Sequence, residues 1–295
     1  MLPVSRLLIL SLLAASSSPA IAHAGADHSD APGWMLDPLV TVPLACVLLL
    51  FLVGRWRLAQ RSKLPRSRAW LFLGGWLVLT GALISPLHEG GERSFTLHMI
   101  EHELIMLVAT LLLAAASAGG VLAWGLPGPL RTALGGRWRM PLAGIWRRLT
   151  EPVTATILQA LMMWAWHAPA FFDRALTSQG WHVAQHLSFV LASLIFWRAM
   201  LDVRRGGYLV SAVCLFLTSL VEGVLGALMA LSASPWYPAY AAMGMSGIGL
   251  DPVSDQQLAG LVMWIPGGLV HGAAALAFLY RWLSTNEDGD AVPSH

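Results

Sequence analysis

The sequence predicts an all-α membrane protein, a polytopic bundle of seven transmembrane helices, from three observations. Only 12 % of the 295 residues are charged and 56 % are hydrophobic, whereas a soluble domain carries about 25 % charged residues. The apolar residues form runs long enough to cross a bilayer. Lys and Arg collect in alternate loops, as they do on the cytoplasmic side of membrane proteins. A formal charge of +2 is too small to indicate a nucleic-acid partner.

The N-terminus predicts a removable signal peptide over residues 1–24. Arg6 precedes a short apolar core, and the core is followed by small residues at Ala20, Ala22 and Ala24. Cleavage after Ala22 or Ala24 would leave the mature chain beginning outside the cytoplasm. Residues 25–36 are then expected to form a short polar lead in the periplasm.

The seven spans are predicted within residues 37–282. Each run holds about 17–25 predominantly apolar residues, which is enough for one crossing. Gly and Pro inside several of the runs are compatible with membrane helices. The expected spans cover residues 37–54, 69–86, 95–117, 152–171, 181–200, 208–231 and 258–282.

The positive charges set the expected orientation of these spans. The loop RWRLAQRSKLPRSR after the first span holds six Lys and Arg residues, and further Arg residues follow the third and fifth spans. The opposite loops hold only Arg93 and Arg174. By the positive-inside rule the odd-numbered spans run from outside to inside. The tail, residues 283–295, is therefore expected in the cytoplasm.

Histidines gather at the outer ends of three predicted spans and indicate a metal site that faces the periplasm. Imidazoles four residues apart on a helix face the same way, with Cβ atoms about 5–6 Å apart, so a pair can bind one ion. Imidazole suits copper, zinc, iron and nickel, and a nearby thioether such as that of Met263 would favour Cu(I). The histidines that begin the third span, end the fourth and begin the fifth are His98, His102, His167, His182 and His186.

Four acidic or basic residues are secondary candidates for the site. Glu101 lies between the first two histidines. Three roles are open for it: a solvated charge, a partner that sets an imidazole tautomer, or a proton acceptor. Glu222 and His271 fall inside the sixth and seventh spans, where ionisable groups are costly and mark function. We expect these two to approach each other, to extend the outer site inward, or to make separate buried hydrogen bonds. Asp255 is expected to cap the seventh helix.

Four motifs make the chain resemble the CtaG-type cytochrome c oxidase assembly factors, which are seven-span membrane proteins. The motifs are HMIEH at 98–102, WHAP at 166–169, HVAQHLSFVLASLIFW at 182–197 and DQQLAGLVMWIPGG at 255–268. In the family a Met often follows the second histidine of the first motif, where this chain has Glu103.

This resemblance implies a non-enzymatic role in the bacterial inner membrane, in the maturation of a haem–copper oxidase. Copper would come from a donor protein in the periplasm and pass to a subunit of the terminal oxidase. The implied ligands are the five histidines of the matched motifs, together with Met263 and Asp255.

Two other functions stay open. A haem-binding membrane oxidoreductase would use His102 and His186 as axial ligands, but such enzymes usually need histidines at separate depths, and here the pairs lie at one level. A metal-ion or proton transporter would need polar residues through the inner half of the bilayer. Below Glu222 and His271 the spans offer almost none.

Overall fold

The structure is a computed structural model that describes residues 33–61, 65–136 and 139–290. Helices account for nearly all regular structure, and no strand occurs within these three ranges. The predicted all-α class is therefore confirmed. The predicted signal peptide, residues 1–24, lies outside the described residues, as do most of the periplasmic lead and the last five residues of the tail.

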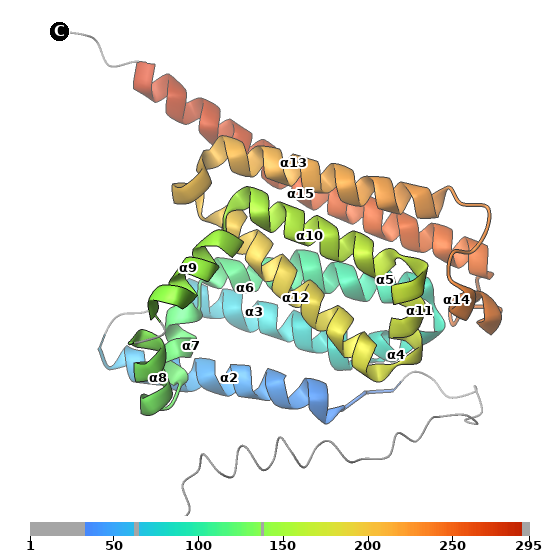
Figure 1. Cartoon of the computed structure of the whole chain (residues 1–295), viewed down its shortest axis with the longest axis horizontal. Helices are drawn as coiled ribbons and strands as arrows, with labels where there is room; N and C mark the ends of the chain where they lie inside the picture. The colour runs from blue at the N-terminus through green and yellow to red at the C-terminus, as the bar shows by residue number, and fades with distance from the viewer. Residues whose placement is uncertain (1–32, 62–64, 137–138, 291–295) are drawn as a thin grey trace, which may run out of the picture. The chain divides into compact units, whose positions relative to one another are not determined.

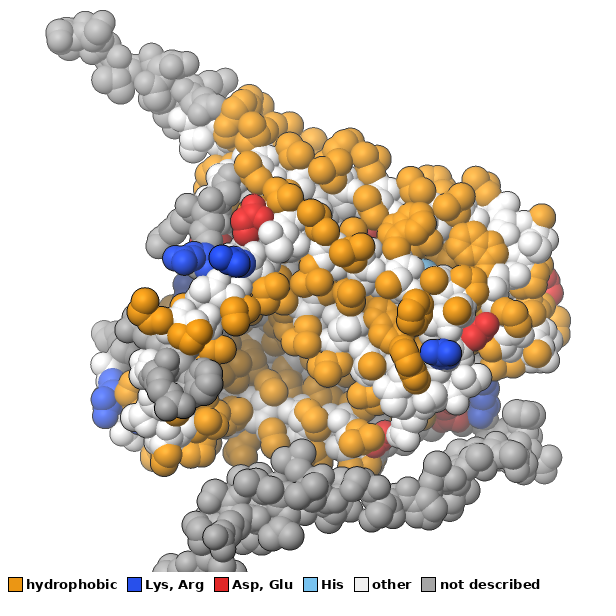
Figure 2. Space-filling model, in the orientation of Figure 1, with side chains coloured by type: hydrophobic (Ala, Val, Ile, Leu, Met, Phe, Trp, Pro, Cys, Tyr) orange, Lys and Arg blue, Asp and Glu red, His pale blue; other side chains and the backbone are white. Residues whose placement is uncertain are grey.

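Six helical segments of the described ranges are long and apolar enough to cross a membrane. They lie alongside one another in a bundle (Figure 1). Apolar side chains cover most of the face seen in Figure 2, and charged side chains lie toward the two ends, as expected of a multi-pass membrane protein. The segments are α2 (Pro38–Ala59), α3 (Arg66–Ile84), the run Phe95–Ala116, α12 (Gln179–Leu201), Gly207–Ala230 within α13 (Val203–Ala230) and Pro252–Thr285 within α15 (Pro252–Asp290).

The predicted fourth span, 152–171, is divided between two helices. α10 (Pro152–His167) is separated by one residue from Pro169, which begins α11 (Pro169–Thr177). Ala168 between them is extended, with ψ 129°, because a residue before proline avoids the helical conformation. α10 has 16 residues and is about 24 Å long, which is shorter than the ~30 Å hydrocarbon core. The count of seven spans therefore stays a prediction.

The third predicted span is a composite helix. α5 (Phe95–Glu103) continues into a π-helical turn, η1 (Leu104–Ala109), and then into α6 (Thr110–Ala116). The carbonyl of Met106 in the π-helical turn accepts a hydrogen bond from the indole N–H of Trp197 at 2.9 Å. Such turns are frequent at functional sites. Here the turn begins two residues after the HMIEH motif, and the hydrogen bond from Trp197 joins it to α12.

Two long helices at the C-terminal half cross closely through glycines. A Cβ atom on Gly226 of α13 would lie 2.8 Å from the carbonyl oxygen of Gly260 of α15, and a Cβ on Gly260 would lie 2.5 Å from that of Gly226. Neither position has room for a side chain, as in other small-residue membrane helix contacts. α15 also packs against α5, so residues of α13 and α15 reach the helix that carries His98 and His102.

Short helices cover the two ends of the bundle (Figure 1). At one end, α4 (Pro86–Arg93) and α14 (Pro238–Met243) lie with α11 near the start of α5. At the other end lie α7 (Gly119–Gly125), α8 (Gly128–Gly135) and α9 (Arg139–Leu149). The first of these two ends holds the candidate site.

Candidate functional site

Five histidines from three helices form one contiguous group, which we call the histidine cluster. Their ring centroids are separated by 4.2 to 6.0 Å between contacting pairs. Four of them were expected at a shared site from their positions in the sequence, and the structure brings these four together. The cluster consists of His88 of α4, His98 and His102 of α5, and His182 and His186 of α12.

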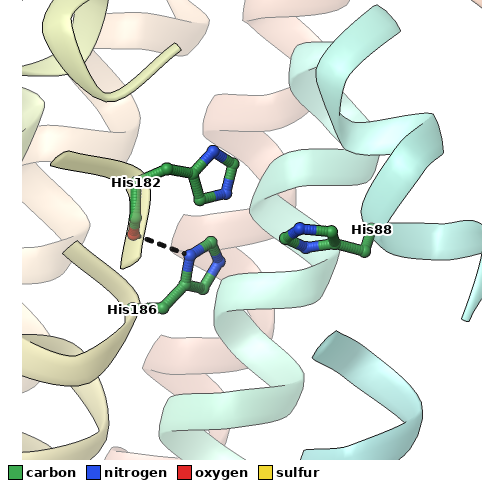
Figure 3. Close-up of side chains that lie close together, drawn as sticks. All are labelled: His88, His182 and His186. Atoms are coloured by element: carbon green, nitrogen blue, oxygen red, sulfur yellow. Dashed lines mark hydrogen bonds between the residues drawn. The ribbon is translucent and has the colours of Figure 1, made fainter. Parts of the chain in front are cut away.

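His88 is the member that the sequence analysis missed. It lies between the second and third predicted spans, in a segment that folds into α4, which begins at Pro86 after the N-cap Ser85. The ring of His88 then faces the two stacked rings of His182 and His186 (Figure 3). Its position near the same end as the other histidines was the available signal, because spacing along the chain could not show the contact.

Three of these rings are arranged to share an ion. One nitrogen from each of His88, His182 and His186 lies within 4.8 Å of the others (Figure 3). Nitrogens on one tetrahedral ion, with bonds of about 2.0–2.1 Å, lie about 3.4 Å apart. Small rotations of the three rings would therefore be enough to bring them to coordination distance.

Glu101 is a fully buried carboxylate between two of these histidines. Its Oε1 accepts a hydrogen bond from Nδ1 of His88 at 2.7 Å and lies 3.1 Å from Nε2 of His186. Burial alone would lower the pKa of His88, but the hydrogen bond and the charge of Glu101 raise it above its usual value. The interpretation of Glu101 as a solvated charge is wrong, since its side chain is 0 % exposed. Its negative charge favours a cation at this site.

Hydrogen bonds set which nitrogen of three rings is available as a ligand. Nδ1 of His88 bonds to Glu101, Nδ1 of His167 to the carbonyl of Met163 at 2.7 Å, and Nδ1 of His186 to the carbonyl of His182 at 3.2 Å. A carbonyl oxygen only accepts, so Nδ1 carries the proton. In the neutral ring the lone pair is then on Nε2. Hydrogen bonds to the nitrogen that does not bind the metal commonly orient metal-binding histidines.

Several ring nitrogens of the site have no hydrogen-bond partner within the part of the chain that the structure describes. These are both nitrogens of His98 and of His102, and Nε2 of His167 and of His182, while Nε2 of His186 has only its 3.1 Å contact with Glu101. His98 and His102 are only 1 % and 3 % exposed. A buried polar atom without a partner costs about 1–3 kcal/mol. A cation with imidazole ligands would satisfy these atoms, so the residues present fit a metal ion of the kind that imidazole binds.

His167 lies beside the histidine cluster, and Met263 belongs to the hydrophobic core that borders it. The ring of His167 contacts Phe172 and Phe189, which in turn contact His98 and His102 respectively. Met263 is buried in the same hydrophobic core as these two phenylalanines. An imidazole is thus available beside the cluster, and a thioether lies in the core that borders it.

Asp255 joins α15 to the first turn of α5. Its carboxylate accepts hydrogen bonds from the backbone N–H groups of Phe95 at 2.7 Å and Thr96 at 3.2 Å, and from the hydroxyls of Ser94 and Thr96 at 3.0 and 2.6 Å. Free N–H groups at a helix start need such partners. Asp255 therefore holds in place the turn that precedes His98, and we assign it no ligand role.

The expectation that Asp255 caps the seventh helix is wrong. α15 begins at Pro252, so Asp255 lies inside its first turns. The cap is Asp251, whose Oδ1 accepts from the N–H groups of Val253 at 3.1 Å and Ser254 at 3.2 Å. The helix starts earlier than its apolar run, which left Asp255 free to cap a neighbouring helix.

Glu222 and His271 approach each other deeper in the bundle, as one of the three alternatives predicted. Oε2 of Glu222 lies 3.0 Å from Nδ1 of His271, which is ion-pair distance, although the angle does not suit a hydrogen bond. The His271 ring stacks on Trp197, with centroids 5.2 Å apart. A Cβ on Gly267 would lie 3.4 Å from Glu222 and 3.7 Å from Glu103, so both carboxylates line the same glycine of α15.

The family model described as "Cytochrome c oxidase caa3 assembly factor" matches residues 49–285 of this chain. The matched range contains the histidine cluster, His167, Met263 and Asp255. Comparison with curated proteins and with solved structures gives no match.

Proposed function

The chain belongs to the family of cytochrome c oxidase caa3 assembly factors, and from this premise we propose that it binds copper at the histidine cluster and delivers it to an oxidase subunit. Copper is then the cargo of an assembly factor, and the protein is not an enzyme. The observation that carries the proposal is the convergence of five imidazoles, four of them buried, in which both nitrogens of His98 and of His102 and Nε2 of His182 lack hydrogen-bond partners among the described residues. The partner would be a subunit of a haem–copper terminal oxidase.

The proposed location is the bacterial inner membrane, with the cluster facing the periplasm. α10 would serve as the fourth of seven spans, with the mature N-terminus outside and the C-terminus in the cytoplasm. Two features support this orientation. The cluster lies at the end with α4, α11 and α14, and the opposite end carries α8 and α9 with Arg131, Arg147 and Arg148. A copper donor protein in the periplasm could then reach the site directly.

The chemistry of the cluster suits an ion that must be received and released. Imidazole nitrogens bind copper in either oxidation state, and the carboxylate of Glu101 offsets its charge. His182 is partly exposed whereas the other members are buried, which gives the ion a route in and out. The thioether of Met263 in the hydrophobic core that borders the cluster would favour Cu(I) over Cu(II).

The proposal is tested by copper binding to the purified full chain in detergent. Cu(I) is titrated against a colorimetric chelator, and the double variant His102→Ala/His186→Ala is expected to lose tight binding. The matched control is Ser193→Ala, which removes a buried hydroxyl two turns further along α12, where it bonds to Gln159. Equal copper binding by the double variant and the control would contradict the proposal.

The same preparations separate the two alternative functions. A Soret absorption band in the purified protein would support a haem-binding oxidoreductase. Accumulation of copper inside proteoliposomes, dependent on Glu222 and His271, would support a transporter, because these groups extend the ionisable residues inward from the cluster. A copper-delivery protein is expected to give neither result. In cells that lack this protein, the oxidase is expected to contain less copper.

A further inference from the structure

We propose that the site holds two cations at once, at two separate positions, an inference that rests on the proposed copper function and goes beyond it. The outer position is formed by His88, His182 and His186. The inner position is formed by His98 and His102, with His167 as a further ligand. The ligand class is a soft monovalent cation, Cu(I) or its analogue Ag(I).

The number of imidazoles is the first argument for two positions. Six histidines supply the outer and inner groups, whereas a protein-bound ion of this class is usually coordinated by no more than about four ligands. The three rings of the outer group already have their nitrogens within 4.8 Å of one another. An ion bound by these three rings would leave His98 and His102 with no ion to coordinate.

The unsatisfied nitrogens of the inner group are the second argument. His98 and His102 are 1 % and 3 % exposed, and neither ring has a hydrogen-bond partner among the residues that the structure describes. Their centroids are 4.2 Å apart, and the spacing of four residues places both rings on the same face of α5. A cation between the two rings would satisfy one nitrogen of each, at a position distinct from one held by the outer group.

His167 is placed to complete the inner group. Its Nδ1 is bonded to the carbonyl of Met163, so the lone pair is on Nε2, which is buried and has no partner in the described ranges. Its ring contacts the two phenylalanines that also contact His98 and His102. α10 therefore ends with an available imidazole nitrogen beside the inner pair.

The two positions are close enough to exchange an ion and share one counter-charge. His186 of the outer group lies 5.2 Å from His102 and 6.0 Å from His98, measured between ring centroids. Glu101 contacts the outer group through Oε1, and its Oε2 has no hydrogen-bond partner within the described residues. Like charges this close repel, and a shared carboxylate makes two monovalent ions more compatible than two divalent ones.

The test is the number of Cu(I) ions bound per chain, measured on the purified full-length protein in detergent against a competing chelator. The wild type is expected to bind two. The outer variant His88→Ala/His182→Ala and the inner variant His98→Ala/His102→Ala are each expected to bind one, and the Ser193→Ala control is expected to bind two. X-ray absorption of each double variant should report nitrogen ligands around its remaining ion.

A wild type that binds one ion, which either double variant abolishes, would overturn the two-position arrangement and leave the proposed copper function standing. A wild type that binds none would contradict the proposed function itself. If an alanine variant does not fold, as judged by gel filtration and circular dichroism, the variants His88→Gln and His102→Gln replace it. Loss of one ion in each supports the proposal, and loss of both ions in either contradicts it.

Discussion

Nδ1 of His88 donates a hydrogen bond of 2.7 Å to Oε1 of Glu101, although the two residues lie on separate helices. This contact holds the ring of His88 against α5 and leaves Nε2 as the nitrogen available to an ion. A buried carboxylate that orients a metal-binding imidazole also raises its basicity. Glu101 is therefore expected to affect copper binding without being a ligand.

Glu101→Gln should lower Cu(I) affinity by about 10–100-fold, the effect typical of losing such an orienting carboxylate. The amide keeps the shape of the side chain but removes the negative charge. The control is Glu151→Gln, an exposed N-cap of α10 that bonds to Thr154. Competition titrations with a Cu(I) chelator measure both, and an unchanged Kd in Glu101→Gln would show that the carboxylate has no such role.

Asp255→Ala should destabilise the protein by about 2–4 kcal/mol, because it removes the acceptor of the first two N–H groups of α5, beside the N-cap Ser94, and leaves buried donors unpaired. Asp255→Asn keeps an acceptor oxygen and should lose less. Asp251→Asn is the matched control, since Asp251 caps an exposed helix start. Unfolding in denaturing detergent gives the free energies, and equal effects at the two positions would contradict the assignment.

Glu222 and His271 should show strong energetic coupling, since the cost of burying one charge alone exceeds that of removing both. Glu222→Leu is expected to lower the free energy of unfolding by about 3–5 kcal/mol. Adding His271→Leu should restore part of this loss. A double-mutant cycle of unfolding free energies measures the coupling. The number of bound copper ions should stay the same in both variants, and a loss of one ion would place the pair inside the copper site.

Met263→Leu should weaken Cu(I) binding by roughly tenfold, equal to ~1.4 kcal/mol, while leaving Zn²⁺ binding unchanged. A thioether is a soft ligand that favours Cu(I), and leucine has nearly the same volume. Met99→Leu, in the same hydrophobic core, is the control. Equal loss of Cu(I) and Zn²⁺ affinity would indicate a packing effect in place of ligation.

The two ends of α10 should lie on opposite sides of the membrane if it is the fourth span. Single cysteines replace Arg148 and Ser178 in a background without Cys46 and Cys214, and an impermeant thiol reagent is added from outside. Ser178→Cys should react and Arg148→Cys should not. A helix of 16 residues can still cross where the bilayer thins around it, whereas labelling of both cysteines would reduce the count to six spans.

The histidine pairs of α5 and α12 could be predicted from the sequence because they depend only on helix periodicity and on which end of each helix faces outward. Spacing of four places two rings on one face, and loop charge gives direction. The part played by His88 could not be predicted in this way. It depends on a short helix that folds back onto α5 and α12, which no local pattern specifies.

Asp255 is a second residue whose contacts could not be predicted from the sequence. Its position before an apolar run indicated a cap, and it is a cap, but for a helix 160 residues earlier in the chain. Its carboxylate reaches Phe95 because α15 packs against α5. The cap was expected at the nearest helix start, because a local sequence pattern does not show contacts between distant helices.

The sequence by itself determined the membrane class, the approximate bounds of six apolar helices long enough to cross a membrane and the candidate metal-binding residues, because hydrophobicity, charge and helical spacing act over one or two turns. The tertiary structure alone decided which of these residues meet, through the packing of α4, α5, α12 and α15. Burial then assigned their roles: Glu101 became an orienting carboxylate and Asp255 a cap, since each lost its water to partners on another helix.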